Sequence, residues 1–164
     1  MTWQESAFVV LGLVGLGSAV RLVTSKNVVH AALYLVVSLL MVGAIYLLLG
    51  AEFIGWVQIL IYVGAIVVLL LFGLMLTRAP IGREALDNQQ RGLSAIVSLG
   101  ILVGLIYLVQ DAFGDQEIIL RPTRIAEAGE SLFTEFVLPF EVVSFLLLAA
   151  LIGAVALARK EESE

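Results

Sequence analysis

The stretch from Ile61 to Leu76, IYVGAIVVLLLFGLML, decides the fold class of this chain. It is aliphatic almost throughout and carries no charge, which is the composition of a helix that crosses a lipid bilayer. Two residues depart from that composition. Tyr62 brings a hydroxyl group that hydrocarbon cannot satisfy, and Gly64 is a weak helix former. The stretch therefore predicts a membrane helix with one unusual spot, whose purpose is a question about function.

The rest of the chain also predicts an integral membrane protein. Of its 164 residues, 61% are hydrophobic and only 14% are charged, so there are too few polar residues to cover a soluble domain. The charges cluster and leave apolar segments that are long enough to span a bilayer as helices. We expect an all-α, polytopic protein, a single membrane domain over residues 1–164, with five transmembrane helices at about 6–23, 28–49, 53–76, 93–113 and 136–158.

Lysine and arginine residues indicate the orientation. With five spans, the loop after the first span, the loop Thr77–Arg91 and the C-terminus share one side of the membrane, and they hold most of the nine basic residues. Positively charged loops stay in the cytoplasm. We therefore expect the N-terminus outside and the C-terminus in the cytoplasm, with the acidic connection Gly114–Glu135 outside.

Composition also excludes several classes of site. The chain has no cysteine, which excludes disulfides, thiolate zinc sites and iron–sulfur ligation. Its one histidine, His30, has no second histidine with which to share a metal ion. The net charge of −5 argues against a nucleic-acid partner. We find no complete active site, no metal site and no cofactor motif in the sequence, so we expect any activity to belong to an assembly.

Polar side chains form stripes inside two of the apolar segments. Gln58 and Tyr62 lie four residues apart in the third span, and Tyr34 and Ser38 lie four apart in the second. Residues at this spacing share one helix face. Such a face contacts protein or water, because an unpartnered polar group is costly in hydrocarbon. The pattern favours hydrogen bonds between helices, and a proton path is the alternative.

Small residues predict close packing between helices. Gly100 and Gly104 form a GxxxG motif in the fourth span, and Gly15 with Ala19 forms a similar pair in the first. Gly64 allows two interpretations. It can admit a neighbouring helix, or it can mark a local irregularity such as a π-bulge, a feature that is frequent at functional sites.

Glu141 lies in the stretch VLPFEVVSFLL, at the start of the fifth span. Pro139 suits the first turn of a helix, where its missing N–H is no loss, and Glu141 would then be a first-turn acid that the helix dipole favours. If the helix instead begins near Phe136, Glu141 lies deeper. It is then a candidate for handling protons or ordering water, as acidic residues within membranes commonly are.

Three stretches together resemble one family. They are KNVVHAALYLVVS (Lys26–Ser38), EFIGWVQILIYVGAIVVLLLFGLML (Glu52–Leu76) and VLPFEVVSFLLLAALIGAVALAR (Val137–Arg159). They resemble subunit J, or chain 6, of NADH:quinone oxidoreductase, the respiratory complex I. The second stretch is the most specific, because YVGAI after a glutamine in an aliphatic span is hard to reach by chance. One departure is Val28, where the family often has proline, and it leaves open where the second span begins.

The resemblance implies a non-redox subunit in the membrane arm of a proton-translocating complex, in the inner (cytoplasmic) membrane of a bacterium. FMN, iron–sulfur clusters and quinone would belong to other subunits, and this chain would carry none of them. Two protein neighbours are implied within the lipid bilayer: a three-span subunit with buried glutamates and the quinone-channel subunit.

The resemblance further implies a π-bulge near the tyrosine–glycine pair of the third span. Its rearrangement between α and π geometry would open and close a water path toward the carboxylates of the neighbour. Carried onto this sequence, the gating candidates are Tyr62, Val63, Gly64 and Ala65. Gln58 and Glu141 are further proton-path candidates because they are polar residues within the apolar segments.

We therefore expect a subunit that couples quinone reduction to proton transfer through a switchable third helix. Two other functions stay open from the residues alone. One is a membrane subunit of a multisubunit cation/proton antiporter, and the other is a purely structural membrane scaffold. The electron donor stays open as well, since ferredoxin-fed relatives of complex I use similar membrane subunits.

Overall fold

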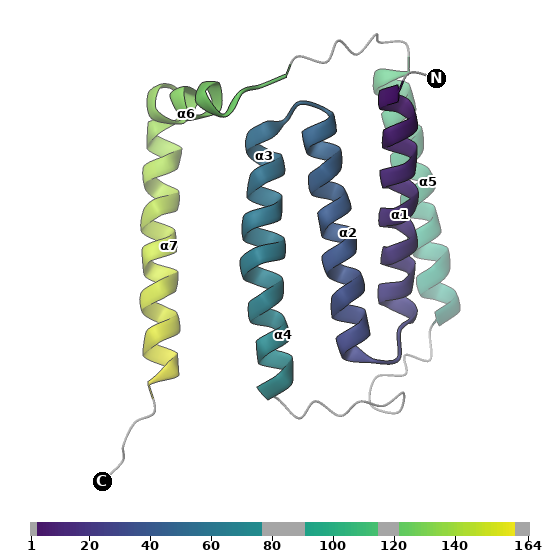
Figure 1. The fold of residues 1–164 in the computed structure, drawn as a ribbon, viewed down its shortest axis with the longest axis horizontal. Helices are drawn as coiled ribbons and strands as arrows, with labels where there is room; N and C mark the ends of the chain where they lie inside the picture. The colour runs from purple at the N-terminus through teal and green to yellow at the C-terminus, as the bar shows by residue number, and fades with distance from the viewer. Residues whose placement is uncertain (1–2, 77–90, 115–121, 160–164) are drawn as a thin grey trace. The chain divides into compact units, whose positions relative to one another are not determined.

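The computed structural model describes residues 3–76, 91–114 and 122–159. Within these ranges nearly every residue is helical and no β-strand is present (Figure 1). Five of the helices are long and apolar enough to cross a bilayer. The expectation of an all-α protein with five membrane-crossing helices is therefore confirmed.

The crossing helices agree closely with the expected spans. They are α1 (Trp3–Thr24), α2 (Val28–Leu48), a continuous third helix made of α3 (Glu52–Val57), η1 (Gln58–Ile66) and α4 (Val67–Leu76), then α5 (Arg91–Phe113) and α7 (Val137–Ala158). The largest difference is at α1, which begins at Trp3 instead of Ser6. The chain forms two compact units, Met1–Pro122 and Thr123–Glu164, which are described separately below. The single membrane domain expected over residues 1–164 stays a prediction.

Asn27 defines the start of the second crossing helix. Its side-chain oxygen accepts hydrogen bonds from the backbone N–H groups of Val29, at 2.9 Å, and His30, at 3.5 Å. Asparagine is a favoured N-cap because this bond satisfies donors that have no partner within the helix. Val28 is then the first helical residue, so the second crossing helix begins at the valine.

A three-residue connection, residues 49–51, joins α2 to the third helix. The N–H of Ala51 donates to the carbonyl of Tyr46 at 2.9 Å, and the N–H of Gly50 donates to that of Leu47 at 3.1 Å. This pair of bonds is the Schellman motif, which needs a residue with positive φ after the helix. Gly50 supplies it, with a φ of 79°. The connection is too short for anything except antiparallel neighbours, so the third helix returns along α2.

The α2 helix is the centre of the first unit, because it packs against α1 on one side and against the third helix on the other (Figure 1). Two glycines allow the closest approach. A methyl group on Gly43 would lie 2.8 Å from Cγ1 of Ile59, and one on Gly55 would lie 2.6 Å from Cδ2 of Leu47. Real side chains do not come that close, so only glycine lets these two backbones meet at this distance.

The contact between α1 and α2 also uses small and polar residues. Ser38 donates its hydroxyl to the carbonyl of Gly15 at 3.4 Å, and a methyl group on Gly15 would lie 3.2 Å from Cβ of Met41. Ser38 and Tyr34 are both half-buried on α2. On α5 the situation differs: a methyl group on Gly100 or Gly104 would have no neighbour within 4 Å among the described residues. The packing role of that GxxxG motif stays a prediction.

The second unit consists of α7 and a shorter helix, α6 (Ile125–Thr134), in the connection expected to be a loop. At helical spacing, Ile125, Leu132 and Phe133 share one face of α6, while Glu127 and Glu130 lie on the opposite face. Figure 1 shows α6 lying across the N-terminal end of α7. The expectation of a plain loop is wrong here, because the segment is amphipathic and Phe133, on its apolar face, contacts Phe140 of α7.

Candidate functional site

The third membrane helix changes its hydrogen-bond register in its first half. The N–H of Gln58 bonds to the carbonyl of Ile54, four residues back, as in an α-helix. The N–H of Val67 bonds instead to the carbonyl of Tyr62, five residues back. Between these points, from Gln58 to Ile66, the helix is a π-helix. Such geometry is rare in proteins, and where it occurs it is often at a functional site.

This π-helix contains all the candidate site residues of the third span. Gln58, Tyr62, Val63, Gly64 and Ala65 all lie within it. The irregularity that the residues alone left undecided is therefore present, and the tyrosine–glycine pair lies inside it.

Packing against α2 gives a reason for π geometry in the segment Gln58–Ile66. The shielded positions of the third helix include a series at steps of four, namely Gly55, Ile59, Val63, Val67 and Leu71. In an α-helix each step of four turns the side chain by about 40°, so four steps would carry it roughly 160° away from α2. A π-helix has more residues per turn and cancels much of that drift. The stripe therefore stays against α2, and Val67 is only 1% exposed.

Packing against α2 does not require Tyr62 or Gly64. Tyr62 is 46% exposed, and its side chain makes no hydrogen bond with any residue that the structure describes. A methyl group on Gly64 would meet only the carbonyl of Ile59, at an ordinary 3.6 Å. Gly43 and Gly55 differ, since a methyl group there would clash. Neither the tyrosine nor the glycine in the π-helix is thus required by the neighbouring helix of this chain.

Glu141 lies in the second unit, in the second turn of α7. The helix begins at Val137 and has no acidic residue in its first turn. Pro139 is within that turn, as expected, but Glu141 is beyond it. The first-turn interpretation of Glu141 is therefore wrong, because the helix begins too early for its dipole to account for the carboxylate.

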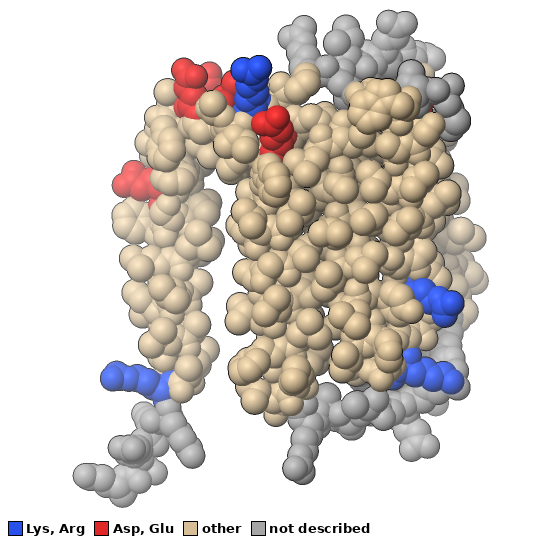
Figure 2. All heavy atoms as spheres, in the orientation of Figure 1, with Lys and Arg blue, Asp and Glu red and all other residues tan. Residues whose placement is uncertain are grey.

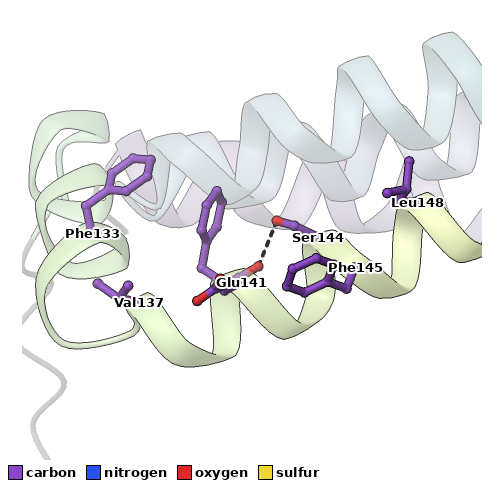
Figure 3. Close-up of a pocket in the computed structure, with 7 residues that line it drawn as sticks. Phe133, Val137, Glu141, Ser144, Phe145 and Leu148 are labelled. Carbon is purple, nitrogen blue, oxygen red and sulfur yellow. Dashed lines mark hydrogen bonds between the residues drawn. The ribbon is translucent and has the colours of Figure 1, made fainter.

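A hollow of about 400 Å³ opens beside Glu141 on one face of α7 (Figure 3). Its lining includes Phe133, Val137, Glu141, Ser144, Phe145 and Leu148. Phe140 completes the lining and meets Phe133 edge to face, with ring centroids 5.1 Å apart. The hydroxyl of Ser144 donates to the backbone carbonyl of Phe140 at 2.8 Å. The hollow is thus apolar except for one carboxylate and one hydroxyl already engaged within its own helix.

Charges separate toward opposite ends of the helices in each unit (Figure 2). In the first unit, Arg21 and Lys26 lie where α1 ends and α2 begins, whereas Glu52 begins the third helix at the other end of α2. In the second unit, Arg159 follows α7, whereas the acidic residues of α6 precede it. Among the described residues, no group of three His, Cys, Asp or Glu side chains is placed to hold a metal ion.

Sequence reasoning missed the close approach of Gly43 to the third helix, although one signal could have found it. The turn at Gly50 is so short that residues at equal distances before and after it must face one another. Gly43 and Gly55 satisfy that condition approximately. The helix α6 was not predicted because it has only 10 residues, and charges and a nearby proline such as Pro122 are typical of a loop.

Comparison with known proteins identifies the family. Residues 18–157 match the family model described as NADH-ubiquinone/plastoquinone oxidoreductase chain 6. The F(420)H(2) dehydrogenase subunit J of Methanosarcina mazei is 39% identical, with 96% of this chain and 92% of the relative covered. The NAD(P)H-quinone oxidoreductase chain 6 of Leptolyngbya boryana is 37% identical, with 96% and 81% covered. The NADH-quinone oxidoreductase subunit J of Escherichia coli is 35% identical, with 98% and 89% covered.

The relatives agree with the architecture, since the matched region runs from α1 to the end of α7 and includes the whole π-helix. This chain belongs to the chain 6, or subunit J, family of the NADH-quinone oxidoreductases, and is a membrane-arm subunit of complex I.

Proposed function

We propose that this subunit couples quinone reduction to proton transfer by switching its third helix between α and π geometry. The observation that carries this proposal is the π-helix Gln58–Ile66, which contains a tyrosine and a glycine that intrachain packing does not require. The subunit itself performs no redox step, and FMN, iron–sulfur clusters and quinone belong to its partners. Family membership favours this role over that of an antiporter subunit.

The switch follows from helix geometry. When the π-helix returns to α geometry, the hydrogen-bond register shifts by one residue, and one half of the helix turns relative to the other by roughly 100°. That rotation moves Tyr62 and Ala65 relative to whatever surrounds them, and it opens or closes a path for water. Gly64 makes the change easier, because a residue without Cβ tolerates more backbone conformations.

The two geometries must lie close in free energy for such a switch to work. The π-helix is the less common arrangement in general, but here it keeps Val67 against α2. Full burial of one valine is worth about 1.5–3 kcal/mol. This is the size of difference that separates a major from a minor conformation, so small changes at the quinone site can bias the equilibrium.

The polarity of Gln58 and Tyr62 indicates what surrounds the π-helix in the assembled complex. Gln58 and Tyr62 make no side-chain hydrogen bond with the described residues of this chain, and polar side chains in a bilayer face protein or water. We assign them to the interface with the three-span, glutamate-bearing subunit, with the quinone-channel subunit as the other neighbour. The ends with Arg21, Lys26 and Arg159 face the cytoplasm, which puts the N-terminus outside a bacterial cytoplasmic membrane.

Glu141 is the second candidate for handling protons. It lies in the second turn of α7 with an exposed side chain, and the first-turn dipole does not account for it. Carboxylates at such positions in membrane proteins mark proton or ion pathways by default. It belongs to a different unit from the π-helix, so the two are proposed as separate elements of one pathway.

The names of the relatives suggest that the role of this subunit does not depend on the electron donor. The relatives are named after different electron donors, F(420)H(2), NAD(P)H and NADH, yet they align with this chain over nearly its whole length. A step that lies downstream of quinone reduction does not need to distinguish among donors. The proposed coupling role satisfies that condition.

The test is to replace Gly64 with leucine in the assembled, reconstituted enzyme. We expect Gly64→Leu to lower the number of protons pumped per electron and the turnover, because the added side chain restricts the backbone that must rearrange. The matched control is Gly73→Leu, on the same helix but outside the π-helix, where a methyl group meets none of the described residues within 4 Å. Wild-type pumping and turnover by the Gly64→Leu enzyme would refute the switch. Reduced abundance with unchanged specific activity would instead indicate a scaffold.

A further inference from the structure

Pro122 lies against the connection between α2 and the third helix, residues 49–51, which we call the Gly50 turn. A methyl group on Gly50 would lie 2.9 Å from Cα and 3.0 Å from Cβ of Pro122. Pro122 is the last residue of the first unit, so this contact lies within that unit. The contact therefore ties two segments that are far apart in the sequence.

The contact requires glycine on one side and suits proline on the other. The φ of Gly50, 79°, is one that residues with a Cβ rarely adopt. The space that its side chain would need is filled by the backbone of Pro122, which cannot turn away as the end of a flexible side chain can. Proline has a fixed φ and no N–H, so its nitrogen brings no backbone donor that would need a partner.

The Gly50 turn is also held from the side of the helices. The N–H groups of Gly50 and Ala51 donate to carbonyls of the last turn of α2. At the start of the third helix, a methyl group on Gly55 would lie 2.6 Å from Cδ2 of Leu47. Neither Gly50 nor Pro122 has a titratable side chain, so a change in protonation does not act on their contact directly. The turn is thus fixed on two sides by contacts between carbon atoms.

We propose that Pro122 acts as a clamp on the Gly50 turn and stays closed throughout turnover, so that the end of α2 and the start of the third helix move as one body. The clamp itself does not depend on the coupling role. Its consequence for the switch does rest on the proposed function: the π-helix rearranges while the turn that precedes the third helix stays fixed.

The first experiment measures hydrogen exchange of the Gly50 and Ala51 amides in the assembled complex, with Pro122→Ala compared with wild type. The substitution removes the ring and the fixed φ. We expect the two amides to exchange about 2- to 5-fold faster, the size that the loss of a well-fitting proline produces. The internal control is the Asn27 cap at the other end of α2, where the amides of Val29 and His30 should exchange as in wild type.

The second experiment locks the clamp with a disulfide, in an enzyme that carries both Gly50→Cys and Pro122→Cys. The chain has no cysteine of its own, and the two Cβ positions would be 3.0 Å apart, close to the roughly 3.5–4.5 Å of a disulfide. Turnover and proton pumping are compared between the oxidised and reduced forms of the same purified complex, so strain at residue 50 affects both. The single variants control for oxidation of other subunits. We expect the locked enzyme to turn over and pump as its reduced form does.

Three results would overturn the proposal. They are unchanged exchange of Gly50 and Ala51 in Pro122→Ala, no disulfide in an assembled double variant, and a disulfide that reversibly lowers turnover or pumping, because the clamp would then have to open. If the double variant does not assemble, the exchange measurement decides alone. Neither experiment alters Gly64, so failure of the clamp and failure of the switch are distinguishable.

Discussion

Individual glycines of this protein perform different tasks, which the structure separates. Gly43 and Gly55 let the backbones of α2 and the third helix approach, because any side chain there would collide. Gly50 adopts a φ of 79° and ends α2. Gly64 has room for a methyl group among the described residues, so close packing does not account for it. The same residue type therefore serves packing or a turn at some positions, whereas at Gly64 backbone freedom is the role that we propose.

The residue whose charge is least explained within the chain is Glu141. Glu141→Gln keeps the shape of the side chain and removes its charge. We expect it to lower quinone-dependent turnover by at least ~10-fold, a conservative lower bound because side chains that transfer protons commonly contribute more. Steady-state turnover of the purified complex measures the effect. Glu135→Gln is the matched control, since this exposed acid lies before α7 begins. Equal turnover of both variants would remove Glu141 from the proton path.

The third helix places a π-helical segment between two α-helical ones. Its N-terminal part is held against α2 by the close approach at Gly43 and Gly55, and its C-terminal part is held by the buried Val67. The π-helix lies between these contacts and keeps both on the side facing α2. The geometry of this element is therefore set by its neighbour as much as by its own residues, as a switch that responds to neighbours requires.

Val67 allows the balance between the two geometries to be tested. Val67→Ala removes two buried methyl groups, which is worth about 1.5 kcal/mol, and shifts the equilibrium about tenfold toward α geometry. Hydrogen exchange of the backbone amides between Gln58 and Val67, measured in the assembled complex, should change as a result. Val68→Ala is the control, since Val68 is 56% exposed. An identical exchange pattern in Val67→Ala and wild type would show that burial of Val67 does not hold the π-helix.

At the scale of the molecule, charge polarity is the property that relates the fold to the membrane. In each unit, basic residues gather at one end of the membrane helices, and acidic residues gather at the other, apart from Arg124 beside α6 (Figure 2). Such a polarity matches the rule that basic residues remain in the cytoplasm. It predicts which end of the membrane helices in each unit faces the cytoplasm.

The absence of cysteine from the sequence makes that orientation directly testable. Ser25→Cys, between α1 and α2, should be protected from a membrane-impermeant thiol reagent applied to intact cells. Glu52→Cys, at the start of the third helix, should be labelled under the same conditions. Labelling of this subunit is read after purification, and permeabilised cells provide the control in which both positions react. The reverse pattern would invert the proposed orientation.

The sequence by itself determined the five membrane helices, the family and the place of the unusual spot at Tyr62 and Gly64. Length, hydropathy and short motifs are local properties, so they can be recognised without knowing what lies beside a helix. Only the tertiary structure decided that the helix around Tyr62 is a π-helix, and that Gly43 rather than Gly64 admits a neighbouring backbone. It also decided that Glu141 lies beyond the first turn of α7. These features depend on the register of one helix against another or on where a helix begins, which hydropathy along the chain does not encode.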